Sequence, residues 1–379
     1  MAAKQMGVFS RGHVLNILSA YTKLTAKPLD SHIRAYFHQR KTVDLREKRE
    51  VADTVYELVR HKLYLETAAQ KPQWEDMLKA YLDPEFRSKQ RTSGLPTHLK
   101  FSFPEPFVEI LRNVYSRKTE MLLSALNHRP PLTVRVNTLK SSCSDLLHKW
   151  RTVDRLGVRK CSSSLYGLQL ITRGAVNLFA MEDFKQGKFE VQDEASQLCS
   201  FQIPAAPHLS ILDFCAGSGG KSLAIAPLMQ NKGQLYLHDI RTVLLQEAKK
   251  RLKRAGVNNA QIVTDLKRLK GKMDIVVVDV PCTGTGTFRR NPDLKWKFSL
   301  EGLKELVQKQ FGIVEEAQRY LKPGGELVYT TCSILPQENL EMVQRIEERL
   351  GFTLVAEPFL TSPLLSDMDG FFTARLKRK

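Results

Sequence analysis

Residues 275–287 read IVVVDVPCTGTGT, and this stretch decides the fold class. Consecutive β-branched residues with no polar neighbour on either face are typical of a strand buried inside a parallel sheet. Pro281 ends the strand, because proline has no N–H to donate to a ladder. Ligands of open α/β sheets bind at the carboxyl ends of the strands, so Asp279 and Cys282 are predicted to lie at the mouth of a site. The alternative is an ordinary loop in which Cys282 is a small hydrophobic side chain.

The surrounding sequence alternates between strand and helix patterns from Ser210 onward, which predicts a doubly wound, mainly parallel α/β sheet. A predicted helix, 300–321, is stopped by Lys322-Pro323-Gly324-Gly325. A last pair, 352–355 and 371–376, is predicted to close the sheet as an edge hairpin. The predicted strands are 209–214, 234–239, 260–263, 275–280 and 326–333.

A loop of small residues, CAGSGGKS at 215–222, follows the first predicted strand. Small residues let the backbone approach a ligand closely. The loop is not a P-loop, because the first glycine of G-x-x-x-x-G-K-[ST] is replaced by Cys215. It also fails the dinucleotide pattern G-x-G-x-x-G, because no third glycine is in register. The sequence therefore favours neither a nucleoside triphosphatase nor a dinucleotide enzyme.

Three further side chains stand at predicted strand ends. Asp239 lies about twenty residues after the glycines, where a carboxylate can accept hydrogen bonds from ribose, although a helix N-cap is an equally compatible role. Asp265 ends the next strand, at a position suited to an adenine edge. Cys332 ends the strand 326–333, and if that strand neighbours 275–280, two cysteines share one mouth.

The region before Ser210 contains two different patterns. Residues 10–85 have helical spacing and predict a small bundle, whose basic face is either solvated or turned toward RNA. Gly, Pro, Ser and Thr mark a connection at 91–106, followed by a helix at 105–126. Residues 130–201 predict a small α+β module. Its predicted elements are strands at 132–137, 168–171 and 187–192 and helices at 144–150 and from 193 onward.

The composition indicates a polyanionic partner. Fifty-eight Lys and Arg against 40 acids give a net charge of +18 and a pI near 9.6, which favours nucleic acid over a membrane surface. No apolar run reaches the ~20 residues of a membrane span. The six cysteines form no C-x-x-C pair, which predicts neither a disulfide framework nor a metal site. The start of the chain is compatible with a mitochondrial transit peptide but reads as readily as a first helix, and we expect a cytoplasmic protein.

Together these motifs resemble one family, the S-adenosylmethionine-dependent RNA cytosine-5 methyltransferases, and most closely its bacterial Sun/RsmB branch, which acts on 16S ribosomal RNA. The resemblance covers roughly residues 100–379 and implies a Rossmann-like class I methyltransferase sheet. The motifs that carry it are DVPC at 279–282, TCS at 331–333, CAGSGGK at 215–221, RVNTL at 135–139, VQDEAS at 191–196 and RRNPD at 289–293.

The resemblance assigns roles that the residues alone leave open. It implies that Cys332 is the nucleophile that adds to C6 of cytosine, and that Cys282 serves product release. Asp279 would contact the base edge and favour protonation of N3, and Lys221 would place a positive charge near the reacting atoms. The cofactor-binding residues it implies are Cys215, Ala216, Gly217, Ser218, Gly219, Gly220, Lys221, Asp239 at the ribose, Asp265 near the adenine and Asp279 near the methionine end.

The chain departs from the family pattern in three places. Ser218 stands where proline is usual, and Arg241 stands where a second acid is frequent; both bear on cofactor affinity more than on activity. The helical region resembles a NusB-type RNA-binding domain but is shortened.

The loop 283–297 carries Arg289, Arg290, Lys295, Trp296 and Lys297. We expect it to be a mobile segment that contacts RNA phosphates and helps to hold a flipped cytosine, the alternative being solvated surface charge.

The resulting prediction is a monomeric methyltransferase with three parts: a helical domain at 1–90, a linker helix and α+β module at 91–201, and a catalytic domain at 202–379. Ribosomal RNA is the favoured substrate and transfer RNA the runner-up. Two other classes remain as alternatives. A DNA or N-methylating enzyme would not need Cys332, and a non-catalytic ribosome-assembly factor would not need the set of strand-end residues.

Overall fold

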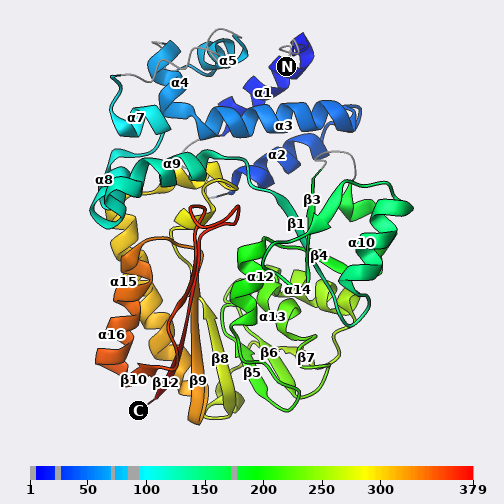
Figure 1. Cartoon of the computed structure of the whole chain (residues 1–379), viewed down its shortest axis with the longest axis vertical. Coiled ribbons are helices and arrows are strands. Elements are labelled where there is room, and N and C mark those ends of the chain that lie inside the picture. Colours follow the sequence, from blue (N-terminus) through cyan, green and yellow to red (C-terminus); the bar gives the residue numbers. More distant parts are fainter. Residues whose placement is uncertain (1–5, 22–26, 70–72, 84–93, 172–176, 379) are drawn as a thin grey trace. The chain divides into compact units, whose positions relative to one another are not determined.

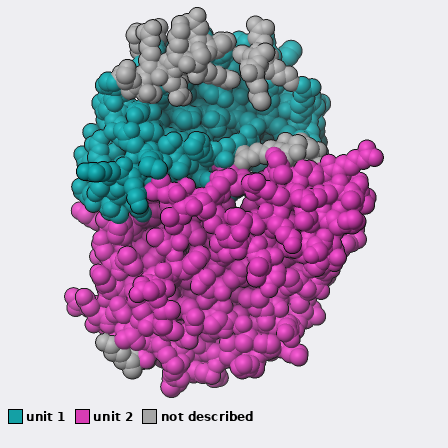
Figure 2. Space-filling model, in the orientation of Figure 1, with its two compact units in different colours: residues 1–129, 287–300 teal, residues 130–286, 301–379 magenta. Residues whose placement is uncertain are grey.

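The computed structural model describes residues 6–21, 27–69, 73–83, 94–171 and 177–378 (Figure 1). The chain divides into two compact units (Figure 2). Unit 1 comprises Met1–Arg129 and Thr287–Leu300, and unit 2 comprises Pro130–Gly286 and Glu301–Lys379. The predicted domain boundary at 90/91 lies outside the described residues, and the one at 201/202 lies within unit 2, so the three-part division stays a prediction.

Unit 1 is helical, as its spacing predicts. In α3, Val51, Val55 and Leu58 lie on one face and are fully buried, while Asp44 caps the helix by accepting a hydrogen bond from the Glu47 amide. The predicted helix 105–126 is instead two helices, because Ser116 (φ 46°) interrupts it. The α-helices are α1 Val8–Ala20, α2 Leu29–His38, α3 Leu45–Arg60, α4 Lys62–Ala69, α5 Trp74–Leu82, α7 Thr97–Phe101, α8 Glu105–Tyr115 and α9 Thr119–Asn127.

The segment 287–300 belongs to unit 1 and overturns one prediction. Lys295 is 0% exposed and its ammonium donates to the backbone carbonyls of Arg60 (3.0 Å) and Ser102 (3.3 Å). The Trp296 indole donates to the Val59 carbonyl (2.8 Å), and Arg289 is 1% exposed. Burial, reinforced by the charge of Arg60, holds the pKa of Lys295 well below its usual value. The expectation that Arg289 and Lys295 contact RNA phosphates is therefore wrong. Lys295 donates hydrogen bonds to carbonyl groups of the helical unit, and both side chains are buried away from solvent.

The α+β module of unit 2 forms an antiparallel sheet in the order β2-β3-β1-β4. Its strands are β1 Leu132–Val136, β2 Val158–Lys160, β3 Gly167–Leu170 and β4 Phe189–Val191, and its helices are α10 Cys143–Thr152, α11 Glu182–Lys185 and α12 Glu194–Phe201. The sequence pattern predicted all of these except β2 and α11. Trp150 of α10 is fully buried in the core of the module.

The second sheet of unit 2 has the order β10-β12-β9-β8-β5-β6-β7, with β11 paired to β12. Strands β5 to β9 pair parallel with one another, whereas β12 pairs antiparallel with β9; the parallel part confirms the Rossmann-like α/β prediction. The strands are β5 Ser210–Asp213, β6 Gln234–Leu237, β7 Ala260–Ile262, β8 Met273–Asp279, β9 Leu321–Thr331, β10 Phe352–Leu354, β11 Phe359–Thr361 and β12 Phe371–Arg378. The predicted pair at the end of the chain forms, with β12 lying between β9 and β10.

Strand β8 explains why its sequence has no polar face. Val276 and Val278 belong to one core, which includes residues of α15 Leu300–Ala317 and α16 Leu340–Leu350. Ile275 and Val277 belong to the core on the other face, with residues of α13 Gly220–Ile225 and α14 Thr242–Ala255. Helices thus cover both faces of the strand, as a buried parallel strand requires. Among the described residues, no helix combines the length and apolarity needed to cross a membrane.

A buried carboxylate in the α+β module yields a stability prediction. Asp183 (side chain 1% exposed) accepts hydrogen bonds from Lys149 (2.7 Å), Lys188 (3.2 Å) and the Trp150 indole (3.0 Å). Asp183→Ala is expected to lower the free energy of unfolding by about 2–4 kcal/mol, because it leaves the buried indole N–H without its partner. Urea denaturation followed by near-UV circular dichroism measures the change. Glu182→Ala, which removes a neighbouring carboxylate that is 64% exposed, should cost less than about 0.5 kcal/mol.

The same carboxylate makes the stability of wild type sensitive to acid. Burial by itself would raise the pKa of Asp183, but its donors outweigh burial and lower it. A depressed pKa means that the stabilisation is present above the ordinary carboxyl range and is lost as pH falls through the folded-state value. An Asp183→Ala protein whose stability falls with acid as steeply as wild type would contradict this assignment.

Candidate active site

Two cysteines meet at the carboxyl ends of β8 and β9. These strands are parallel neighbours in which Asp279 lies beside Thr330, so Cys282 and Cys332 both emerge just beyond the sheet. Their sulfur atoms are 3.3 Å apart and both side chains are partly exposed. The prediction that neighbouring strands bring the two thiols to one mouth is confirmed.

The two thiols differ in their electrostatic environment. The hydrogen bond to Cys332, together with burial, raises the pKa of Cys282 well above its usual value. Cys282 is therefore held as a neutral thiol that can donate its S–H to the Cys332 sulfur. The S–H of Cys282 is thus placed to point at the sulfur of Cys332.

The loop after β8 is held by residues that sequence reasoning missed. Glu338 is fully buried and accepts hydrogen bonds from the Thr283 amide (2.8 Å) and the Gln310 side-chain amide (2.9 Å). Gln310 also donates to the Pro281 carbonyl (3.0 Å). These contacts fix the backbone on both sides of Cys282. In the sequence, Glu338 resembles an ordinary acid near a helix start, so no local signal distinguishes it.

Gly286, in the loop after β8, lies close to the backbone of Cys332 and Gly370. The Gly286 amide donates to the Cys332 carbonyl (3.0 Å), and the Gly370 amide donates to the Gly286 carbonyl (2.8 Å). A β-carbon on Gly286 would lie 2.0 Å from the Gly370 carbonyl oxygen, so only glycine fits here. Gly286 therefore ties the two cysteine loops together, and the mobility of the loop stays a prediction.

Lys221 and Asp279 form an ion pair beside the cysteine strand. Lys221 projects from α13, is 6% exposed, and places its ammonium 2.6 Å from the Asp279 carboxylate, which is 38% exposed. Burial alone would lower the pKa of Lys221, but the charge and hydrogen bond of Asp279 outweigh burial and raise it. Lys221 is thus a buried, permanent cation, and Asp279 keeps an accessible edge.

The glycine loop turns sharply between β5 and α13. Gly217 (φ 53°) and Gly219 (φ 81°) both have left-handed backbones, which glycine adopts without strain. Ala216 donates its amide to the His238 carbonyl (2.8 Å), and Ser218 accepts from Arg251 (2.7 Å). Burial raises the pKa of Cys215 to about 12, so this thiol is not activated. Gly220, the last member of the loop, begins α13.

Asp213, at the end of β5, is a second residue that sequence reasoning missed. It is 1% exposed, and burial raises its pKa to about 6, although the Ser222 hydroxyl donates to it (2.7 Å). Its other carboxylate oxygen has no hydrogen-bond partner. The sequence offered only a weak signal, because Asp213 reads as part of an apolar strand.

Asp239, at the end of β6, is surrounded by donors. It accepts from the Gly217 amide (2.8 Å), from the Arg241 amide (2.8 Å), and from two nitrogens of the Arg241 guanidinium (2.9 Å each). These bonds lower the pKa of Asp239, although burial alone would raise it. Asp239 thus anchors the glycine loop in this structure, but it is not a helix N-cap, because the N-cap residue of α14 is Arg241. The ribose role stays a prediction.

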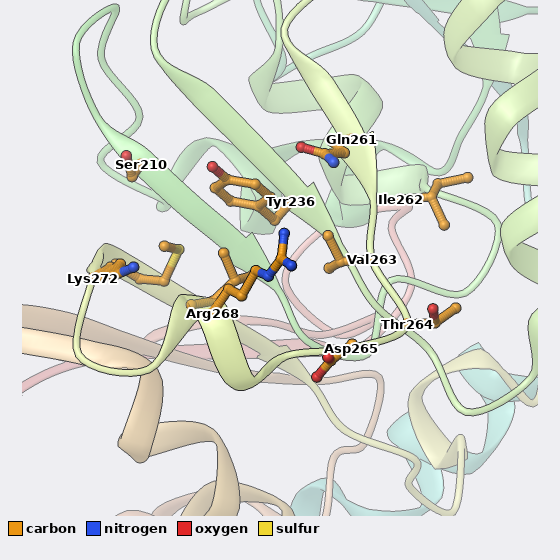
Figure 3. A pocket seen from close by; sticks show the side chains of 11 residues that line it. Ser210, Tyr236, Gln261, Ile262, Val263, Thr264, Asp265, Arg268 and Lys272 are labelled. Atoms are coloured by element: carbon orange, nitrogen blue, oxygen red, sulfur yellow. The ribbon is translucent and has the colours of Figure 1, made fainter.

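Asp265 lies apart from the cysteines, at the rim of an open groove of about 610 Å³ along β6 and β7 (Figure 3). It is exposed and accepts a hydrogen bond from the Lys267 amide (3.0 Å). The side chain of Arg268 extends toward Tyr236 and Val263 across this groove (Figure 3). Of the predicted site residues, Asp265 alone lines the groove; the structure brings Cys282 together with Cys332, and Lys221 together with Asp279.

Comparison with known proteins places the chain among similar sequences and folds. Residues 203–377 match the family model described as 16S rRNA methyltransferase RsmB/F, and residues 103–177 match the ferredoxin-like domain of RsmF/B-like methyltransferases. The chain is 32% identical over 293 residues to ribosomal RNA small subunit methyltransferase B of Enterobacter sp. (strain 638), covering 73% of this chain and 67% of that protein. It is 30% identical over 332 residues to the protein of the same name from Yersinia pseudotuberculosis (serotype O:1b, strain IP 31758), covering 83% of this chain and 75% of that protein.

Solved structures share the fold at lower identity. The protein PH0851 superimposes with a TM-score of 0.82 at 22% identity, over 99% of this chain and 100% of that chain. A methyltransferase homolog from Pyrococcus horikoshii gives a TM-score of 0.66 at 24% identity, over 75% and 98% of the two chains. These likenesses support the α/β architecture described above.

Proposed function

Because the chain belongs to the RsmB/F family of 16S rRNA methyltransferases, we propose that it transfers a methyl group to C5 of a cytosine in ribosomal RNA. The predicted family is thereby confirmed, and with it S-adenosylmethionine as the methyl donor of an RNA methyltransferase. The observation that carries the finer proposal is the pair of thiols 3.3 Å apart at the ends of β8 and β9. Methylation of an exocyclic amine would not require two such cysteines.

The residues present fit S-adenosylmethionine. Gly217 and Gly219 form a turn whose backbone a ligand can approach. A β-carbon on Gly219 would lie 3.3 Å from the β-carbon of Ala248, so a larger residue would crowd this turn. The unpartnered oxygen of Asp213 is a buried acceptor beneath this loop. Asp239, Asp265 and Asp279 stand at or just beyond the carboxyl ends of β6, β7 and β8, on the edge of the sheet where such ligands bind. When bound, S-adenosylmethionine supplies an electrophilic methyl group on a sulfonium.

In the proposed first half of the reaction, the Cys332 thiolate adds to C6 of the cytosine and forms a carbon–sulfur bond. The electrons of the C5–C6 double bond shift through C4 to N3, which accepts a proton. C5 is then part of an enamine and is nucleophilic enough to take the methyl group. Cys282 supports this step by donating its S–H to the thiolate before the addition. Asp279, whose accessible edge is 38% of its side chain, is the group proposed to stabilise the protonated N3.

In the second half, C5 loses its proton, the C5–C6 double bond re-forms, the sulfur of Cys332 leaves C6 as a thiolate, and N3 gives up the proton that it accepted in the first half. We assign the proton transfer at this stage to Cys282. Once Cys332 is bonded to carbon, the hydrogen bond between the two sulfur atoms is released; Cys282 then gives its proton to solvent, and its thiolate takes the proton from C5. Lys221 stays paired with Asp279 throughout, so the carboxylate remains oriented toward the base.

The RNA substrate is proposed from charge and from the names of the relatives. The net charge of +18 favours a polyanion, and exposed cations such as Arg34, Lys41 and Arg46 lie on the helical unit. The relatives named above are methyltransferases of small-subunit ribosomal RNA. We propose that substrate here, with transfer RNA as the second arm of the test, and a monomeric enzyme.

The experiment that tests the function identifies the methylated atom. Purified protein, S-adenosylmethionine and small-subunit ribosomal RNA or transfer RNA that carries tritium at C5 of cytosine are incubated together. We expect one tritium released to water for each methyl group transferred, and 5-methylcytidine after digestion, with ribosomal RNA as the better substrate. Methyl transfer without tritium release would contradict the C5 assignment, and faster turnover of transfer RNA would contradict the substrate.

A further inference from the structure

The carboxylate of Asp239 has no acceptor position left. An ionised carboxylate offers about four lone-pair positions, two on each oxygen. In this structure one oxygen accepts from the amide and Nε of Arg241, and the other accepts from the Gly217 amide and Nη2 of Arg241. The side chain of Asp239 is only 3% exposed, so no further donor reaches it from solvent.

These four hydrogen bonds fall into two kinds. The two backbone amides belong to Gly217 in the glycine loop and to Arg241, the residue just before α14, so they are parts of the fold. The two guanidinium bonds come from a side chain that is 63% exposed and can rotate into water. One guanidinium bond goes to each oxygen, and these are the two positions that the vicinal hydroxyls of a ribose would take. A β-carbon on Gly217 would lie 3.9 Å from Nη2 of Arg241, so the guanidinium also lies over the glycine loop.

We propose that Arg241 occupies the ribose position of the cofactor site, and that it must leave Asp239 before S-adenosylmethionine can bind there. Arg241 is then a determinant of cofactor affinity, because every binding event first breaks a bidentate ion pair. The inference rests on the proposed function only through the identity of the cofactor. The proposal predicts that wild type binds the cofactor more weakly than a variant that lacks the Arg241 side chain.

The test measures binding and needs no RNA. S-adenosylhomocysteine, which has no net charge, is titrated by calorimetry into wild type, Arg241→Ala and Arg241→Lys. We expect Arg241→Ala to bind about three- to tenfold more tightly, the range set by the strength of a partly exposed ion pair, with Arg241→Lys in between. Lys249→Ala removes an exposed cation from the same helix and should bind as wild type does. Thermal melts check the folding of Arg241→Ala, in which both backbone donors to Asp239 remain.

A second ligand separates competition for Asp239 from a general effect of charge. In wild type the 2′-deoxy compound leaves one oxygen of Asp239 available to Arg241, so the lost hydroxyl contact is offset by a retained guanidinium bond, and 2′-deoxy-S-adenosylhomocysteine should bind nearly as well as the parent compound. In Arg241→Ala the loss of the hydroxyl should cost several-fold more. Equal or weaker binding of the parent compound by folded Arg241→Ala would overturn the role of Arg241 while leaving the proposed function intact. Failure of every variant, wild type included, to bind S-adenosylhomocysteine would instead remove the cofactor premise.

Discussion

Cys332→Ala is expected to eliminate methyl transfer, with a fall in rate of at least about 10⁴-fold, as for enzymes that lose their covalent nucleophile. Without this sulfur, C5 of cytosine has no route to the nucleophilic state. Methyl incorporation into small-subunit ribosomal RNA from labelled S-adenosylmethionine measures the effect, and denaturing gels should show no protein–RNA adduct.

Two controls separate chemistry from folding in this experiment. Cys332→Ser keeps a hydrogen-bonding group beside Cys282 but lacks an ionisable thiol, so it should be as inactive as alanine while binding S-adenosylhomocysteine normally. Cys143→Ala, which removes a partly exposed cysteine of α10, should retain full activity. Methyl transfer by Cys332→Ala at a wild-type rate would rule out the covalent assignment.

Cys282→Ala is expected to trap the enzyme on its substrate. Addition by Cys332 remains possible, but the group proposed to complete the release of the product is gone. A band of protein–RNA adduct should therefore build up on denaturing gels, to about the stoichiometry of the enzyme, while turnover falls by about 10²–10⁴-fold as for the loss of an acid–base group. The geometry supports the pairing of roles, because only 3.3 Å separates the two sulfur atoms.

The double variant Cys282→Ala/Cys332→Ala identifies the attached residue. It should form no adduct, because the trapped bond is proposed to involve Cys332. An adduct in Cys332→Ala and none in Cys282→Ala would show that the two roles are reversed. Absence of an adduct in every variant, with turnover intact, would indicate a reaction without covalent attachment.

Much of unit 2 could be predicted because its signals are local. The run 275–280 has no polar face, which indicates a strand covered by helices on both sides, and the next strand-end cysteine lies fifty residues further along the chain, as a parallel crossover requires. The meeting of Cys282 and Cys332 follows from those two facts. Strands β2 and β11, each of three residues, were missed, whereas β4, β7 and β10 are equally short but were predicted because they lie within longer strand-like runs.

The residues that were misread depend on partners distant in sequence. Arg289 and Lys295 look like surface cations, since lysine and arginine are rarely fully buried. Burial of Lys295 is tolerated because the carbonyl oxygens of Arg60 and Ser102 accept hydrogen bonds from its ammonium. The roles of Glu338 and Asp239 could not be predicted for the same reason. Each role depends on which donors hydrogen-bond to the carboxylate, and no spacing of residues in the sequence reveals those donors.

The division of unit 1 has a consequence for synthesis of the protein. Its second segment, Thr287–Leu300, is translated about 160 residues after Arg129. Because translation adds roughly 5–20 residues per second, Lys295 and Trp296 are synthesised on the order of 10–30 s after the amino-terminal helices. Until then the carbonyls of Val59, Arg60 and Ser102 lack the donors that they have in the finished fold. The helical unit therefore cannot complete its folding first on the ribosome, and a fragment ending at Arg129 should behave as an unfinished, aggregation-prone chain.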